Sequence, residues 1–244
     1  MPKTALITDA GHFLGPPGTK ALIAAGWQVF AVDDDAADPA KREALSAKLP
    51  GATLLEANDP ETVVAEVMDR AGSLDLLVNN DAFPAIRGPV GEAREEDLVA
   101  TYEALVFKSF RMTQAAVKPM KAAKAGKILF ATSAAPLNGI PNYSIYASAR
   151  GAGNALALTL SKELAAFNIQ VNAVAPNFVE SPDYFPESLM ADPTSAEKIL
   201  KNIPLRRLGK PEEAASLIVY LASEGADFIT GQTIPLAGGW ATAR

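Results

Sequence analysis

The sequence predicts a single α/β domain in which helices cover both faces of a seven-stranded parallel sheet. Three observations lead to this prediction. Short apolar runs alternate with longer segments of helical periodicity, several of those segments begin with proline and acidic residues, and no linker or internal repeat divides the chain. With 244 residues, 49% hydrophobic and 20% charged, the chain is long enough to bury one large core. We therefore expect residues 1–244 to form one domain.

The seven expected strands are the short apolar runs. They lie at residues 5–8, 28–32, 53–55, 74–78, 127–132, 170–175 and 233–236. Strands that alternate with helices along the chain form parallel sheets, because each crossover helix packs back onto a face of the sheet. The predicted fold is therefore a Rossmann-like, doubly wound three-layer sandwich.

The segments between the strands carry signals of helix starts. Pro60 and Pro211 are each followed by glutamate, which suits the first turn of a helix, where proline loses no hydrogen bond and acidic side chains meet the helix dipole. Longer helices are expected from Asp97 to Met120 and from Tyr146 to Phe167. Such helices can pair between subunits, although an amphipathic face also suits packing within one chain. We interpret residues 179–193, rich in Pro, Ser and Asp, as a loop or short helices above the ligand site.

Composition excludes several classes of function. The chain has no cysteine and one histidine, His12, so we expect neither thiolate chemistry nor a metal site. A net charge of -6 without a basic run argues against nucleic acid or an anionic membrane surface as partner. No apolar run approaches the ~18 residues of a membrane span, and the N-terminus has no signal-peptide pattern. We expect a cytoplasmic protein that acts on small molecules.

The turn after the first strand does not suit a dinucleotide. Glycines in such a turn let the backbone approach a pyrophosphate, but Phe13 fills that space with a ring. Asp9 adds a charge that repels a phosphate by roughly 1–4 kcal/mol. Pro16 and Pro17 remove two N–H donors from the following helix start. An alternative is a divergent but working cofactor loop.

Three acidic residues after the second strand favour that alternative. Asp33, Asp34 and Asp35 lie where an acid binds the ribose in NAD enzymes. They also suit a solvated turn. We interpret them as inherited from a nucleotide-binding ancestor, without a present role in cofactor binding.

A serine, a tyrosine and an arginine form the candidate catalytic group. Ser133 follows a predicted strand, and Tyr146 lies thirteen residues later and four residues before Arg150, on one face of a predicted helix. With 5 Tyr and 22 Lys+Arg, about 0.5 Tyr-x-x-x-basic matches arise by chance, so the spacing alone is weak. Other motifs give it context: residues 79–82, residues 172–176 and the glycines from Gly231 to Gly239.

Together these motifs resemble the short-chain dehydrogenases/reductases over essentially the whole chain. The redox members of that superfamily carry a lysine, which holds the nicotinamide ribose, where this chain has Arg150. A planar guanidinium does not reproduce the contacts of an ammonium. Combined with Phe13 in the first turn, the pattern Ser-x12-Tyr-x3-Arg resembles the halohydrin dehalogenases.

The resemblance implies a cofactor-independent carbon-halogen lyase. Halohydrin dehalogenases convert vicinal halo-alcohols to epoxides plus halide and a proton, open epoxides with anionic nucleophiles in reverse, and bind halide where a nicotinamide would lie. It also implies a homotetramer. By this resemblance Tyr146 is the base, Ser133 binds the substrate oxygen and Arg150 tunes Tyr146. The chemistry of the residues agrees, because a neighbouring cation favours the phenolate form of a tyrosine, whose ordinary pKa is about 10.

The resemblance also supplies the halide-binding residues and Tyr184 or Phe185. The other substrate-pocket residues are expected from their positions, beside the turn after the fourth strand and between Ser133 and Tyr146. Backbone N–H groups and the positive edges of aromatic rings can hold a large, weakly hydrated halide. The expected halide-binding residues are Phe13, Pro176, Asn177, Phe178 and Val179. The expected substrate-pocket residues are Phe83, Pro84, Leu137, Ile140, Asn142, Tyr184 and Phe185. We expect no cofactor-binding residues.

Each of these assignments has a plainer alternative. Phe13 and Phe178 also suit simple packing, and Asp81 is either a charge that balances Arg150 or a turn residue. His12 fits a loop or surface position, and Trp240 either reaches a neighbouring subunit or packs near the end of its own chain. For the whole protein, the rivals are an NAD(P)-dependent short-chain reductase with an atypical loop and a ligand-sensing protein without catalysis. The sequence leaves substrate size, enantiopreference, preferred halide and physiological role open.

Overall fold

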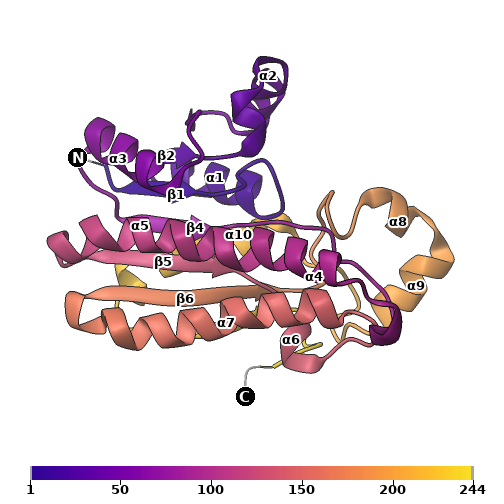
Figure 1. Cartoon of the computed structure of the whole chain (residues 1–244). Coiled ribbons are helices and arrows are strands. Elements are labelled where there is room, and N and C mark those ends of the chain that lie inside the picture. The colour runs from indigo at the N-terminus through magenta and orange to yellow at the C-terminus, as the bar shows by residue number, and fades with distance from the viewer. Residues whose placement is uncertain (1, 243–244) are drawn as a thin grey trace.

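The computed structural model describes residues 2–242 and has one parallel sheet at its centre. Its seven strands run in the order β3-β2-β1-β4-β5-β6-β7, with every neighbouring pair parallel. Figure 1 shows the strands of this sheet with helices packed along them. The chain therefore reverses its direction of winding between β1 and β4, which is the arrangement of a doubly wound fold. The predicted fold class is confirmed.

All seven predicted strands are present, with small shifts at their ends. Their bounds are Thr4–Ile7 (β1), Gln28–Ala31 (β2), Thr53–Leu54 (β3), Leu76–Asn79 (β4), Gly126–Ala131 (β5), Ile169–Pro176 (β6) and Thr233–Leu236 (β7). The two strands beside the site, β5 and β6, pair over six residues and bury almost every side chain. Continuous apolar runs identified them because neither of their faces meets water.

The α-helices of the described chain include both of the helix starts that the sequence predicts. Their bounds are Gly15–Ala24 (α1), Pro39–Lys48 (α2), Pro60–Ala71 (α3), Glu95–Tyr102 (α4), Lys108–Ala123 (α5), Ala135–Asn138 (α6), Ser144–Leu164 (α7), Glu187–Ala191 (α8), Pro193–Lys201 (α9) and Pro211–Ala222 (α10). The helix starts predicted at Pro60 and Pro211 are confirmed. The helix expected from Asp97 to Met120 is present from Glu95 to Ala123 as α4 and α5, which a π-helical turn, Glu103–Phe107, joins.

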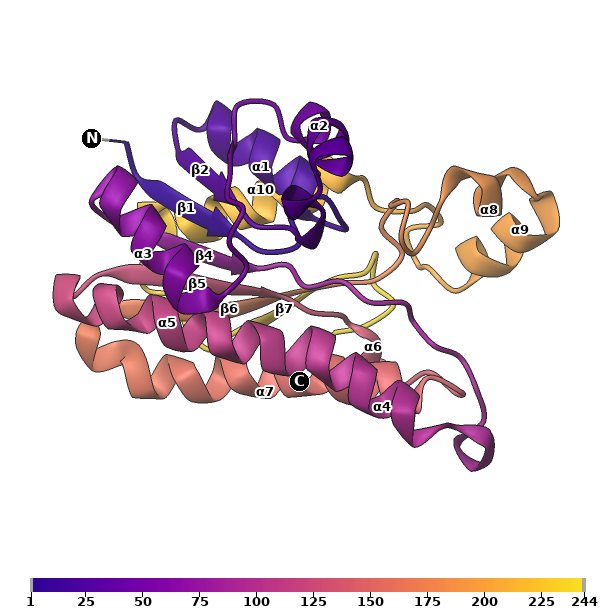
Figure 2. The same cartoon turned by 45° about the horizontal axis from the view of Figure 1, so that its top comes forward.

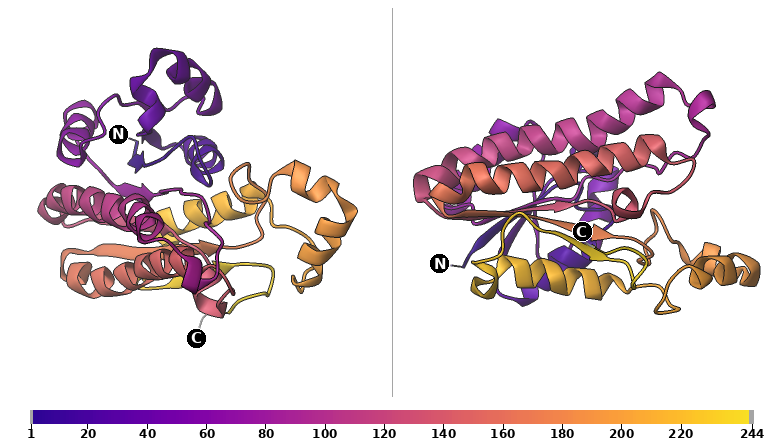
Figure 3. Two further views of the ribbon diagram at one scale, coloured as in Figure 1. Left: turned by 45° about the vertical axis from the view of Figure 1, so that its right-hand side comes forward. Right: turned by 90° about the horizontal axis from the view of Figure 1, so that it is seen from below.

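Two hydrophobic cores lie on opposite faces of the sheet, and residues alternate between them along each strand. Leu6 of β1 belongs to the core under α3, α5 and α7, whereas its neighbour Ile7 belongs to the core under α1 and α10. Burying a side chain such as Leu6, which is 0% exposed, stabilises the fold by about 1.5–3 kcal/mol. Figure 3 shows these three layers, with the sheet between the two sets of helices.

The carboxyl ends of the strands meet at one edge of the sheet, where the loops that follow them gather. Beyond this edge, α8 and α9 project away from the three layers (Figure 2). The segment predicted as a loop or short helices, residues 179–193, forms two isolated bridges, Val179 to Gly209 and Ser181 to Phe185, before α8 begins. Because parallel sheets bind ligands at this edge, the side chains there are the candidates for function.

None of the helices within residues 2–242 has both the length and the apolar character needed to cross a lipid bilayer.

We expect two glycines of α1 to respond oppositely to alanine. A Cβ at Gly15 would lie 2.3 Å from the Ala10 carbonyl oxygen, whereas a Cβ at Gly18 would meet only the flexible end of Ile218, at 3.4 Å. Gly15→Ala should therefore lower the free energy of unfolding by about 1–3 kcal/mol through overpacking. Gly18→Ala, the matched control, should leave it unchanged or raise it by up to about 1 kcal/mol because alanine favours the helix. Urea denaturation measures both, and equal losses would contradict the expectation.

Candidate active site

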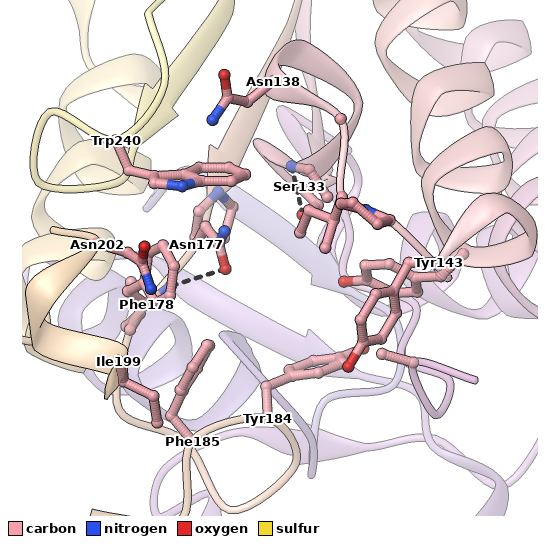
Figure 4. A pocket seen from close by; sticks show the side chains of 18 of the residues that line it. Ser133, Asn138, Tyr143, Asn177, Phe178, Tyr184, Phe185, Ile199, Asn202 and Trp240 are labelled. Carbon is pink, nitrogen blue, oxygen red and sulfur yellow. Dashed lines mark hydrogen bonds between the residues drawn. The ribbon is translucent and has the colours of Figure 1, made fainter. Parts of the chain in front are cut away.

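A cavity of about 560 Å³ opens at the carboxyl ends of β5 and β6, and we call it the main cavity. Figure 4 shows its walls, to which the segments after both strands, the loop before α8, helix α9 and the C-terminal segment contribute. Seven of its twenty lining residues are aromatic. The lining residues are Phe13, Ala85, Ser133, Ala135, Asn138, Gly139, Ile140, Pro141, Tyr143, Tyr146, Pro176, Asn177, Phe178, Val179, Tyr184, Phe185, Leu189, Ile199, Asn202 and Trp240.

Ser133 presents its hydroxyl to the main cavity from the segment after β5. The residue is 3% exposed, and its Oγ accepts a hydrogen bond from the Ala135 N–H at 3.0 Å, at the start of α6. This bond uses an acceptor lone pair and fixes the side-chain rotamer. The hydroxyl hydrogen therefore stays available for an oxygen atom bound in the cavity.

Tyr146 and Arg150 lie one turn apart on α7, on the face that packs against the strand ends. Both are buried, at 8% and 3% exposure. The Arg150 guanidinium carbon lies 5.3 Å from the centroid of the Tyr146 ring and 5.8 Å from that of Phe13. Arg150 lines the interior behind the two rings, whereas Tyr146 lines the main cavity. The cation thus stands behind the tyrosine that faces the cavity.

Neutral groups hold the Arg150 guanidinium. Its Nη1 donates to the carbonyl oxygens of Asp81, at 3.0 Å, and Ala131, at 2.9 Å, and its Nη2 donates to the Tyr184 hydroxyl at 2.9 Å. Burial lowers the pKa of Arg150, but the neighbouring phenol groups of Tyr146 and Tyr184 outweigh this effect and the net shift is upward. The buried arginine therefore stays charged and exerts its field on both tyrosines.

Tyr184 is a neutral donor in this arrangement. Its hydroxyl donates to the Phe83 carbonyl at 3.0 Å while it accepts from Arg150, and burial raises its pKa to about 12. Its ring meets the Phe13 ring edge-on at 5.0 Å and lies 6.1 Å from the Tyr146 ring. Since the Tyr184 proton is committed to Phe83, Tyr146 is the tyrosine of the pair that is placed to exchange a proton with a bound molecule.

The turn after β6 forms the opposite wall. Phe178 has a left-handed backbone, with φ of 57°, and its N–H donates to Asn177 Oδ1 at 3.0 Å. The Phe178 ring packs against Phe185 and Trp240, each with ring centroids 5.4 Å apart. Within the described chain, the buried Nδ2 of Asn177 has no hydrogen-bond partner. The wall therefore combines aromatic rings with one amide donor.

In the first loop, residues 8–15, backbone N–H groups are hydrogen-bonded to acceptors elsewhere in the chain or within the loop. Each N–H from residue 10 to residue 15 donates to an acceptor within the chain. In order, the acceptors are Val32 O, Asp33 Oδ2, Asp9 O, Asp183 Oδ2, Asn80 Oδ1 and His12 O. Two of these acceptors are carboxylates, so negative charge already lies against the loop.

A second cavity of about 340 Å³ lies on the other side of Tyr184, and we call it the acidic cavity. Five aspartates line it, and Lys108 partly balances them by bonding Asp9 at 2.5 Å and Asp34 at 3.5 Å. The lining residues are Asp9, His12, Asp33, Asp34, Asp35, Ala82, Phe83, Pro84, Asp183 and Tyr184. Elsewhere in residues 2–242, as here, no group of His, Asp and Glu side chains is arranged to hold a metal ion.

Known proteins resemble this chain in sequence over nearly its whole length. A family model described as enoyl-(acyl carrier protein) reductase matches residues 15–241. The 3-oxoacyl-(acyl-carrier-protein) reductase of Thermotoga maritima is 34% identical over 97% of this chain and 97% of its own length. The L-xylulose reductase of Bos taurus is 32% identical over 98% of this chain and 96% of its own. The chain belongs to the short-chain dehydrogenase/reductase superfamily.

Within the superfamily, two solved structures are especially similar. One, described as a dehalogenation enzyme, is 45% identical with a TM-score of 0.95 and covers 98% of both chains. The other, a halohydrin dehalogenase bound to ethyl (2S)-oxiran-2-ylacetate, is 35% identical with a TM-score of 0.93, covering 99% of this chain and 98% of the other. The resemblance that the sequence predicted is confirmed.

The first loop does not fit the dinucleotide that redox members of the superfamily bind. A pyrophosphate needs free backbone N–H groups at a helix start, yet those of residues 10–15 are occupied and Pro16 and Pro17 have none. The Phe13 ring faces the main cavity, and aspartates line the adjoining acidic cavity. Asp33, the candidate ribose ligand, instead binds the N–H groups of Gly11, at 2.9 Å, and Asp35, at 3.0 Å.

The structure brings the predicted halide-binding group together. Phe13, Pro176, Asn177, Phe178 and Val179 all line the main cavity with Ser133 and Tyr146. Trp240 lines the cavity of its own chain. Asp81 meets Arg150 through its backbone carbonyl, while its carboxylate accepts from the Thr8 hydroxyl at 3.1 Å.

The predicted substrate-pocket residues divide between several places. Ile140, Tyr184 and Phe185 line the main cavity, but Phe83 and Pro84 line the acidic cavity. Leu137 and Asn142 line neither. Leu137 packs in the small cluster of Ala134, Ala237 and Ala241, because the one-turn helix α6 directs it toward the C-terminal segment. Asn142 has a left-handed backbone, with φ of 69°, and its carbonyl accepts from the Gly88 N–H.

Sequence reasoning missed several residues of the site. Tyr143, Asn138 and Asn202 line the main cavity, and Asp183 binds the first loop. Tyr143 and Asn138 lie between Ser133 and Tyr146, so their position along the chain was a usable signal. Asn202 and Asp183 carry no such signal, because their distance in sequence from the candidate catalytic group says nothing of their place in the fold.

We expect Asp81 to make stability fall as pH rises through the acidic range. Burial raises the pKa of its carboxyl from the ordinary 3.8 to about 7, with a further rise from Asp9 that Lys108 opposes. Below both values the carboxyl is protonated in the folded and the unfolded chain. As pH rises, the unfolded chain ionises first, so the free energy of unfolding falls between about pH 4 and pH 7.

Asp81→Asn should remove this contribution while its amide oxygen still accepts from Thr8. Urea denaturation of both proteins from about pH 4 to pH 8 gives the comparison, with the variant gaining stability relative to the original as pH rises. Parallel curves over the whole range would contradict the raised pKa.

Proposed function

We propose that this protein is a halohydrin dehalogenase that works without a redox cofactor. It closes vicinal halo-alcohols to epoxides, with release of halide and a proton. The observation that carries the proposal is the position of Arg150, which stands where redox relatives have lysine and supports Tyr146 from behind a cavity shared with Ser133. The superfamily does not by itself decide between this reaction and reduction, since its members include reductases.

The reaction follows from the two hydroxyl groups in the main cavity. Ser133 donates a hydrogen bond to the substrate hydroxyl oxygen, while Tyr146, as phenolate, accepts the proton of that hydroxyl. The oxygen then attacks the adjacent carbon as the carbon–halogen bond breaks on the opposite side. A C–O bond forms, halide leaves with the bonding electrons, and no hydride moves. Because nucleophile and leaving group belong to one molecule, orientation in the cavity supplies much of the acceleration.

Arg150 favours the phenolate that this step requires. Its charge is buried and held by carbonyl groups and a neutral tyrosine, and among residues 2–242 no carboxylate is hydrogen-bonded to it. A cation in low dielectric acts more strongly on a neighbouring phenol than one in water. The arginine is thus an electrostatic partner of Tyr146.

The halide leaves toward the aromatic wall. The edges of the Phe13 and Phe178 rings carry partial positive charge, and the same wall contains the buried Nδ2 of Asn177, a donor without a partner among residues 2–242. A large, weakly hydrated anion fits such an environment better than a phosphate does. The reverse reaction uses the same groups: an anion enters at this wall and opens an epoxide while Tyr146 returns its proton. A homotetramer and a cytoplasmic location belong to the same proposal.

The competing function is that of an NAD(P)-dependent reductase, and Asp33 at the end of β2 favours it. Titration with NADH and NADPH, followed by nucleotide fluorescence, tests it. Since the first-loop donors are occupied and aspartates line the adjoining cavity, we expect no saturable binding of either nucleotide at concentrations up to about 1 mM. Tight binding of either nucleotide would favour the reductase.

We expect Tyr146→Phe to stop bromide release. Purified protein incubated with a vicinal bromo-alcohol, without nucleotide, should release bromide and protons in equal amounts. Loss of the base should lower the rate by about 10²–10⁴-fold. Tyr220→Phe is the matched control, because Tyr220 is 48% exposed on α10 and lies outside the cavity.

Two further variants sharpen this test. Ser133→Ala should lower the same rate, and Arg150→Lys should not restore the arginine's function, because an ammonium cannot bond both carbonyls and Tyr184 in the fork geometry. An unchanged rate in Tyr146→Phe would remove the proposed mechanism. No bromide release by the unaltered protein, whatever the bromo-alcohol, would remove the proposed function.

A further inference from the structure

Asp183, in the loop between β6 and α8, reaches across to the first loop. Its Oδ2 accepts from the Phe13 N–H at 2.6 Å, and its Oδ1 lies 3.2 Å from His12 Nδ1. The side chain is 26% exposed at the rim of the acidic cavity. A contact between residues 170 positions apart therefore joins two segments that both contribute residues to the lining of the main cavity.

The Asp183 carboxylate lies where a nucleotide-binding turn would hold a phosphate group. Backbone N–H groups just before a helix bind anions, and in nucleotide-binding turns they bind the pyrophosphate. Here the N–H of Phe13, two residues before α1 begins, binds the chain's own anion in a short, charge-assisted hydrogen bond. The hydrogen bond to His12 lowers the pKa of Asp183 and keeps the carboxylate charged.

Phe13 needs this support. Its backbone is left-handed, with φ of 46°, a conformation that costs a residue with a bulky side chain and persists only where its surroundings hold it. Asp183 holds its N–H, while the next residue, Tyr184, packs edge-on against its ring and bonds Arg150. Consecutive residues of one loop thus fix both the backbone and the ring of Phe13.

Resting on the proposed function, we propose that Asp183 is a positioning residue for the halide end of the cavity. By holding the Phe13 backbone, it fixes the ring edge that faces the departing anion, and so sets the affinity for halide. Asp183 does not touch the substrate. The negative charge of Asp183 repels a nearby halide and lowers the affinity for it. Its positioning of Phe13 raises that affinity, so an experiment must separate the two effects.

Two variants separate them. Asp183→Ala and Asp183→Asn both remove the negative charge, but asparagine keeps an oxygen for the Phe13 N–H and an amide for neutral His12. Asp192→Ala is the matched control, because Asp192 lies in the same segment and its carboxylate also accepts backbone N–H groups, those of Ser195 and Thr194, at the exposed start of α9. Bromide affinity is measured by isothermal titration calorimetry, and bromide release from a bromo-alcohol is measured alongside it.

We expect Asp183→Ala to bind bromide about tenfold more weakly than Asp183→Asn, a difference of about 1.4 kcal/mol. Asp192→Ala should match the unaltered protein. If alanine at 183 prevents folding, Asp183→Ser, which cannot reach Phe13, replaces it. Two results would overturn the role of Asp183 while leaving the proposed function intact. One is equal bromide affinity in Asp183→Asn and in Asp183→Ala, or in the serine variant that replaces it. The other is an equal loss of bromide affinity in Asp192→Ala. Failure of the unaltered protein to bind or release bromide would instead reject the function, and this inference with it.

Discussion

The buried guanidinium of Arg150 is the interaction on which the site depends. It bonds the carbonyl after β4, the carbonyl at the end of β5 and the hydroxyl of Tyr184. It thereby ties α7, two strand ends and the loop after β6 to one point. A charge buried without a directly bonded carboxylate is costly, and such groups persist where function requires them. The planar fork suits this role because it reaches three acceptors in different directions.

The first loop shows the other half of the same change. In redox relatives this segment binds phosphates. Here its backbone N–H groups donate hydrogen bonds to Asp33, Asp183 and Asn80. The loop after β6 closes over it, and Phe13 and Tyr184 turn their rings toward the main cavity. The donors of this loop are therefore bonded within the chain, and its Phe13 ring lines an aromatic cavity.

The sequence predicts the framework well because its signals are local. Strands buried on both faces are continuous apolar runs, and prolines mark the first turns of α3 and α10. The spacing of Ser133, Tyr146 and Arg150 predicts their proximity because one strand end and one helix turn position all three side chains. The π-helical turn between α4 and α5 has no comparable signal, since the hydrophobic pattern runs through it.

Loop contacts are where sequence reasoning ends. Tyr143 enters the main cavity while Asn142, its neighbour, does not, because a left-handed backbone at Asn142 redirects the chain. Asp183 meets Phe13 only because two loops from distant parts of the chain share one edge of the sheet. No periodicity encodes such a meeting, so these residues become visible only in three dimensions.

The acidic cavity affects the direction in which an anion can leave the main cavity. Tyr184 belongs to the linings of both cavities, so a single aromatic layer separates the main cavity from a field of five carboxylates. An anion in the main cavity is repelled more strongly as it moves toward the acidic cavity. Under the proposed function, a halide formed in the main cavity therefore leaves on the side away from the acidic cavity.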